Sequence, residues 1–182
     1  MKFSKNVRRL TTLSVLTGLS IVLMLLIRFP IFPAAPYLEY EPMDVPILIA
    51  GFAFGPLAGL AVTAVSSVIQ GVTVSAAVGG WVGILMHFIA TGTLVTVSSL
   101  IYKHKQTVTG AVIALVAGTI AMSVIMIPAN LIITPAFFGT PPEVVQSLLL
   151  PVLIPFNLIK AGINSAIAFV IYKPLRKFII KN

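Results

Sequence analysis

Long apolar runs, separated by short polar or proline-rich stretches, dominate the chain. The runs are apolar on all sides, which predicts membrane-spanning helices rather than the alternating strands of a β-barrel. One run, residues 45–78, is too long for a single span of about 20 residues, and Gly55-Pro56 is the natural break within it. The pattern therefore predicts six spans, at residues 10–27, 45–55, 57–74, 81–102, 108–133 and 148–172.

Two longer connections, residues 28–44 and 134–147, are expected to be extracellular loops. The first holds four prolines and three of the chain's four acidic residues, and the second holds the fourth, Glu143. The prolines argue against a regular helix in the first loop. A loop of this length is typical of a lid or binding loop, although a solvated loop with interfacial aromatic residues is an equally good interpretation.

Composition and charge agree with a membrane protein. The chain of 182 residues is 58% hydrophobic and 9% charged, whereas soluble domains carry about a quarter charged residues. With six spans, the basic clusters at 2–9, 103–105 and 173–181 fall on one side and all four acids on the other. The positive-inside rule then predicts cytoplasmic termini for a single membrane domain, residues 1–182. Orientation and anionic lipid explain the net charge of +8 without a nucleic-acid partner.

The last span carries polar side chains at helical spacing. Asn157, Lys160 and Asn164 share one face of a helix there. A charge at membrane depth is costly unless it faces a protein interior or a wet cavity, so this stripe predicts a ligand site. Asn130 lies at a similar depth in the fifth span. The alternatives are a lysine that snorkels to the headgroups and asparagines that only join helices.

This donor set limits the chemistry of the site. Amides and an ammonium suit a flat heterocycle with carbonyl and ring-nitrogen acceptors, and Tyr37 and Tyr40 of the first loop could cover it. His87 has no second histidine or acid at ligand spacing, and Asp44 is far from it in sequence, so we expect neither a metal site nor catalysis. No cofactor is expected, and no ATP-binding motif is found. The chain lacks cysteine.

The first span carries a small-residue pattern, Ser14-x-x-x-Gly18. Such a pattern lets a second helix approach closely, which would suit a docking face. Ordinary packing within the bundle is the alternative.

Four stretches together carry a resemblance to a known family. They are Pro-Tyr-Leu leading to Asp44-Val45-Pro46, residues 52–59, Asn130 before Pro135 and Phe138-Gly139, and residues 154–160. The chain resembles, nearly end to end, the substrate-binding S component of energy-coupling factor (ECF) vitamin transporters, most closely its riboflavin-binding members. The resemblance implies six helices in a bacterial cytoplasmic membrane and an outward-facing vitamin site with Asn130, Asn157 and Lys160 on the ring.

The resemblance also implies partners, namely a membrane scaffold subunit (T component) driven by two ATPases, with Ser14 and Gly18 on the docking face. One stretch differs: riboflavin-binding members carry a Lys-Asn pair in the third helix, where this chain has residues 66–71, Ser-Ser-Val-Ile-Gln-Gly. Pyridoxine or a hydroxymethylpyrimidine therefore stays open as the ligand. From the residues alone, a stand-alone ion-coupled transporter and a scaffold without ligand also stay open.

Overall fold

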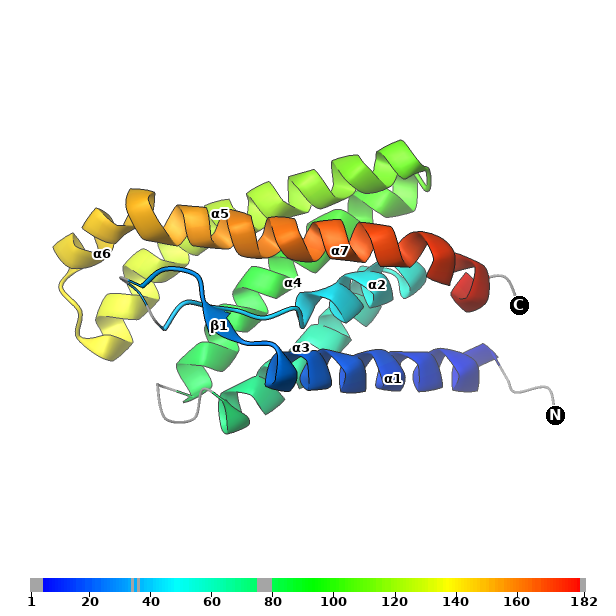
Figure 1. Ribbon diagram of the computed structural model, residues 1–182, viewed down its shortest axis with the longest axis horizontal. Helices are drawn as coiled ribbons and strands as arrows, with labels where there is room; N and C mark the ends of the chain where they lie inside the picture. Colours follow the sequence, from blue (N-terminus) through cyan, green and yellow to red (C-terminus); the bar gives the residue numbers. More distant parts are fainter. Residues whose placement is uncertain (1–4, 34, 36, 75–79, 181–182) are drawn as a thin grey trace.

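The computed structural model of the protein describes residues 5–33, 35, 37–74 and 80–180, which form a helical bundle with one small hairpin (Figure 1). Lys2 and Lys181 of the predicted basic clusters lie outside these residues. In chain order the elements are α1 (Lys5–Leu26), β1 (Phe29–Pro30), β2 (Glu39–Tyr40), α2 (Asp44–Phe54), α3 (Pro56–Thr73), α4 (Gly80–His104), α5 (Val108–Phe138), α6 (Pro142–Leu148), the π-helical turn η2 (Leu149–Leu153) and α7 (Ile154–Ile180).

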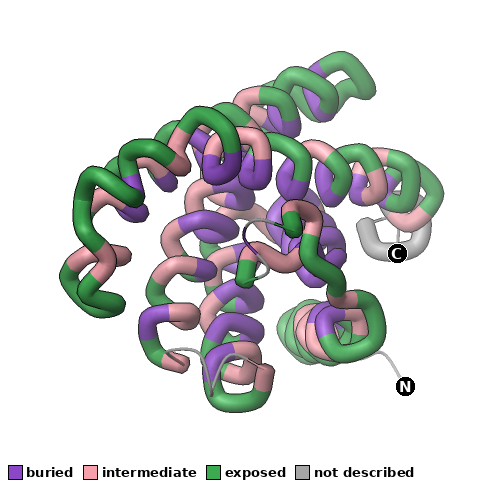
Figure 2. The backbone as a smooth tube through the Cα atoms, turned by 60° about the vertical axis from the view of Figure 1, so that its left-hand side comes forward, coloured by how far each residue is buried: buried purple, intermediate pink, exposed green. Residues whose placement is uncertain are grey.

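The short helix α2 is the centre of the bundle. Every residue from Asp44 to Phe52 is buried, and α1, α3, α4 and α7 all pack against this helix. A helix that is apolar on all sides belongs in an interior, which explains its position. Figure 2 shows the buried positions on the inner sides of the surrounding helices. Asp44, the first residue of α2, therefore lies in the middle of the protein.

Within the described residues, five helical segments are long and apolar enough to cross a membrane: α1, α3, α4, α5 and the continuous run from α6 into α7. The eleven residues of α2 span about 16 Å, well short of the hydrocarbon thickness of about 30 Å. The prediction of an all-α integral membrane protein is confirmed, and α2 is an apolar helix enclosed by the others.

The connection between α2 and α3 is a single residue. Gly55 has a φ of 91°, a region that residues with a side chain rarely adopt, and Pro56 then opens α3 at the position where its missing N–H is harmless. The two helices therefore separate at the predicted break, Gly55-Pro56.

The expectation that residues 134–147 form a loop needs correction, because most of them are helical. α5 continues to Phe138 with Pro128 and Pro135 inside it, and ends at Gly139, whose φ is 64°. Membrane helices tolerate internal proline because neighbouring groups satisfy the freed carbonyls. Pro142 begins α6 in the first turn, where proline is favourable.

The bundle has two chemically different ends. The termini of the described chain, the α2–α3 turn and the α4–α5 turn lie at one end, on the right in Figure 1. The basic cluster 103–105 lies at the α4–α5 turn, so this is the basic end of the bundle. The α5–α6 turn and the β1–β2 hairpin lie toward the other, and the hairpin pairs Phe29 with Tyr40 and Pro30 with Glu39. The hairpin thereby brings the acidic segment 39–44 against the helices.

Candidate substrate-binding site

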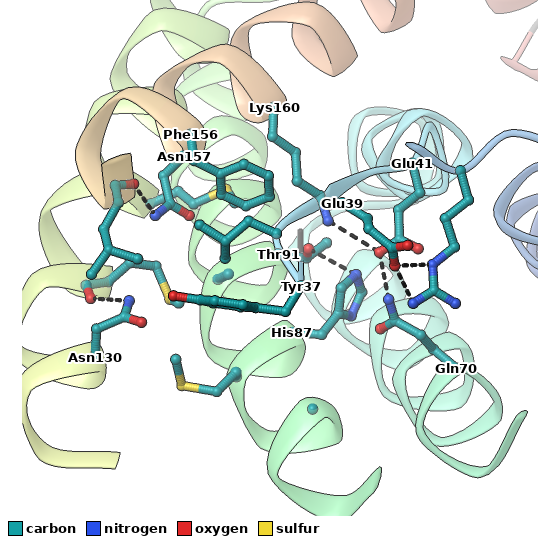
Figure 3. A pocket seen from close by; sticks show the side chains of 18 residues that line it. Tyr37, Glu39, Glu41, Gln70, His87, Thr91, Asn130, Phe156, Asn157 and Lys160 are labelled. Atoms are coloured by element: carbon teal, nitrogen blue, oxygen red, sulfur yellow. Dashed lines mark hydrogen bonds and ion pairs between the residues drawn. The ribbon is translucent and has the colours of Figure 1, made fainter. Parts of the chain in front are cut away.

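A cavity of about 170 Å³ lies between the hairpin segment and helices α3, α4, α5 and α7 (Figure 3). Met86, Met122, Met126 and Phe156 give it apolar walls. Its polar lining consists of Arg28, Tyr37, Glu39, Glu41, Gln70, His87, Thr91, Asn130, Asn157 and Lys160. The structure thus brings together four of the predicted site residues, Tyr37, Asn130, Asn157 and Lys160, from a loop and two helices.

One side of the cavity is formed by two amides. Asn130 Nδ2 donates to Met126 O at 2.7 Å, and Asn157 Nδ2 donates to Leu153 O at 2.8 Å. Each bond runs back one turn along its own helix, and Leu153 ends the π-helical turn η2. Each amide keeps a second N–H and its Oδ1 for a ligand. The amides therefore offer both donors and acceptors.

The other side of the cavity carries charge. Lys160 is 7% exposed, and its Nζ lies 3.1 Å from Glu41 Oε1. Gln70 Nε2 donates to the same carboxylate oxygen. At the rim, Arg28 forms an ion pair with Glu39. The lysine therefore faces the interior and does not snorkel to the headgroups, and two of its three N–H groups remain available.

A buried polar network lies behind the charged side. The two carboxylate oxygens of Asp44 accept hydrogen bonds from Thr91 Oγ1 at 2.8 Å and from Asn164 Nδ2 at 3.0 Å. His87 Nε2 lies 3.4 Å from Asp44, and His87 Nδ1 is 2.7 Å from Ser67 Oγ. Asp44 and His87 are far apart in sequence, but α4 packs against α2 and brings them together.

Two predicted site residues, Tyr40 and Asn164, do not line the cavity. Tyr40 alternates with Glu39 and Glu41 along the extended segment, so its side chain points to the other face. Its hydroxyl donates to Asn164 Oδ1 at 3.0 Å, and Asn164 Nδ2 also donates to Glu41 O at 3.1 Å. The pair therefore holds the segment that carries Glu41 against α7.

Sequence reasoning missed six polar lining residues: Arg28, Glu39, Glu41, Gln70, His87 and Thr91. Gln70 could have been found, because it is the one strongly polar side chain of its predicted span. Glu41 could have been found as an acidic residue next to the apolar run. Among the described residues, no group of three His, Cys, Asp or Glu side chains is placed to hold a metal ion.

A polar cavity enclosed by membrane helices defines this molecule as a membrane-embedded binding protein. The family model for the substrate-specific component of ECF transporters matches residues 8–172. The chain therefore belongs to the family of ECF transporter substrate-specific components. It is a transporter component rather than an enzyme, and it resides in the cell membrane as a multi-pass protein.

Individual relatives match nearly end to end. The chain is 34% identical to the riboflavin transporter FmnP of Bacillus subtilis (strain 168), over 96% of this chain and 95% of that one. It is 30% identical to the riboflavin transporter RibU of Staphylococcus aureus (strain TCH60), over 94% and 92%. A solved structure of the S component of a bacterial ECF transporter superposes with a TM-score of 0.82 at 30% identity, covering 97% of this chain and 99% of that one.

Proposed function

We propose that this chain captures riboflavin for an ECF importer. The observation that carries the proposal is the convergence of Asn130, Asn157 and Lys160 on one cavity. The names of the similar FmnP and RibU transporters support the choice of vitamin. Pyridoxine and hydroxymethylpyrimidine, which offer fewer ring acceptors and no long hydroxylated chain, are the competing ligands.

The amides and Lys160 suit the ring of riboflavin, and the acidic residues suit its hydroxylated side chain. The flavin ring carries carbonyl and ring-nitrogen acceptors and one N–H donor, which complement the amides of Asn130 and Asn157 and the ammonium of Lys160. Tyr37 reaches into the cavity from the loop and offers a flat surface (Figure 3). The hydroxylated side chain would meet Glu41 and the charged rim, where carboxylate oxygens accept hydrogen bonds.

The orientation follows from charge. With the basic end in the cytoplasm, the acidic hairpin and the cavity face outward, and both termini lie inside. For this topology the extended segment before α2, together with α2, must return the chain across the membrane as a sixth crossing. The cavity would then be open to vitamin outside the cell.

Titration of the purified chain tests the ligand. We expect riboflavin to bind one to one, with quenching of flavin fluorescence, and to bind more tightly than pyridoxine or hydroxymethylpyrimidine. Asn157→Ala should weaken riboflavin binding by about 1 kcal/mol, roughly fivefold, because one neutral hydrogen bond is lost. The exposed Asn6 of α1 provides a matched control, and Asn6→Ala should bind as wild type does.

If pyridoxine or the pyrimidine binds more tightly than riboflavin, that compound is the ligand and the assignment of the site still holds. Equal binding by wild type and Asn157→Ala would contradict the site. Uptake into vesicles by the chain alone, driven by an ion gradient, would contradict the dependence on ATPases and favour a secondary transporter.

We further propose that α1 docks on a T component that two ATPases drive. Most of α1 is not covered by the bundle, and both Ser14 and Gly18 are exposed. A Cβ at Gly18 would meet no atom within 4 Å, so this stretch of α1 presents a flat surface on which a second helix can lie.

Gly18→Leu should abolish riboflavin uptake in cells while leaving binding by the purified protein unchanged, because the added side chain blocks docking and starts from a Cβ that meets no atom of the bundle within 4 Å. The measurements are uptake of labelled riboflavin and fluorescence titration. Gly162→Leu on α7 is the matched control, since a Cβ there also meets open space, and it should transport normally. Normal uptake by Gly18→Leu would remove α1 as the docking face.

A further inference from the structure

A second cavity, of about 340 Å³, lies at the basic end of the bundle, away from the first. It is bounded by the α2–α3 turn, the N-terminal part of α1 and the C-terminal part of α4, and Arg9, Lys103 and Ser99 are among its lining residues. None of the chain's four acidic residues lines it. Its ionisable lining is therefore entirely basic.

The two cations have hydrogen-bonding capacity to spare. Arg9 Nη2 donates to Phe54 O at 3.5 Å, and its guanidinium carbon lies 5.9 Å from the centre of the Phe54 ring. Arginine has five N–H donors, so most remain for another group. Lys103 is exposed in the last turn of α4. The N-terminus of α3 has no side-chain cap and adds partial positive charge.

The most buried polar residue of the cavity lining is Ser99, which is 1% exposed. Its Oγ has no hydrogen-bond partner among the described residues, although it lines the cavity. A buried hydroxyl without a partner is unfavourable, and serines within helices usually donate back to their own backbone. Its O–H is therefore a hydrogen-bond donor of the cavity lining that lacks an acceptor among the described residues.

We propose that this cavity binds a phosphate group, supplied by the headgroup of an anionic phospholipid or by a small soluble phosphate ester. A phosphate offers several acceptor oxygens and negative charge, which match the arginine fork, the lysine and the serine hydroxyl. An uncapped helix N-terminus is a favourable place for such an anion. The cavity lies at the ends of membrane helices, the level at which lipid headgroups meet basic side chains.

Lipid binding is tested with the full chain in nanodiscs of phosphatidylcholine, with or without phosphatidylglycerol. Phosphatidylglycerol should raise the melting temperature of wild type, and native mass spectrometry should find it retained. Lys103→Gln and Arg9→Gln should each weaken retention about five- to tenfold. Lys105→Gln is the matched control, because Lys105 is exposed two residues further on and does not line the cavity, and it should behave as wild type does.

Soluble phosphate is tested by adding inorganic phosphate or glycerol 3-phosphate in phosphatidylcholine nanodiscs. A shift with these compounds that Lys103→Gln abolishes assigns the site to a soluble ester, whereas a shift with phosphatidylglycerol alone assigns it to lipid. Ser99→Ala should leave the melting temperature in phosphatidylcholine alone unchanged and reduce the shift caused by phosphatidylglycerol or the soluble phosphate. The proposal is overturned if neither source shifts wild type, if Lys105→Gln loses as much as Lys103→Gln, or if Ser99→Ala keeps the full shift.

Discussion

Replacing Asp44 with alanine should destabilise the protein by about 3–5 kcal/mol, the usual loss when one partner of a buried charged network is removed. Asp44 is fully buried and accepts hydrogen bonds from Thr91 and Asn164. Alanine removes one acceptor from the Thr91 hydroxyl and one of the two acceptors of the Asn164 amide, and it removes the carboxylate beside His87. The free energy of unfolding, measured in mixed micelles of mild detergent and SDS, checks the prediction.

Two control variants distinguish the effect of breaking the network on stability from the effect of removing an acidic residue. Asp44→Asn keeps the volume and one acceptor oxygen, so it should lose only about 1–3 kcal/mol. Glu143→Gln removes the exposed acid of α6 and should change stability by less than about 0.5 kcal/mol. A loss for Asp44→Ala no larger than that for Glu143→Gln would show that the Asp44 network does not stabilise the bundle.

Much of the fold could be predicted, because membrane helices satisfy their backbone hydrogen bonds internally and appear in the sequence as long apolar segments. The break at Gly55-Pro56 could be predicted from residue type as well. The length of α5 could not be predicted, because a proline such as Pro135 usually ends a helix in a soluble protein but is tolerated within a membrane helix. Pro142, which lies within the predicted loop 134–147, in fact begins α6.

Part of the candidate site could be predicted from the sequence. Lys160 and Asn157 could be found because polar side chains at helical spacing in an apolar segment need a reason to be there. Their counterpart Glu41 could not be paired with Lys160, since the two are 119 residues apart and meet only through the hairpin. Tyr40 was placed in the site from its loop, but the alternation of an extended chain turns it away.

Lys160→Met should both destabilise the protein and weaken riboflavin binding. In this variant the Glu41 carboxylate, which is 3% exposed, keeps the Gln70 amide as a partner but loses the ammonium. A buried charge that loses its partner costs about 3–5 kcal/mol of stability. If Lys160 also donates to the flavin ring, binding should weaken by about 1.5–3 kcal/mol, roughly 10- to 150-fold. Unfolding without ligand and fluorescence titration measure the two effects separately.

The double variant Glu41→Gln/Lys160→Met distinguishes these roles. It removes both charges, so most of the lost stability should return, because neutral pairs replace a buried ion pair with little penalty. Riboflavin affinity should stay low, because the ammonium that binds the ring is still missing. Recovery of affinity together with stability would show that Lys160 acts only by holding Glu41 in place, and the ligand would then depend on the amides of Asn130 and Asn157 alone.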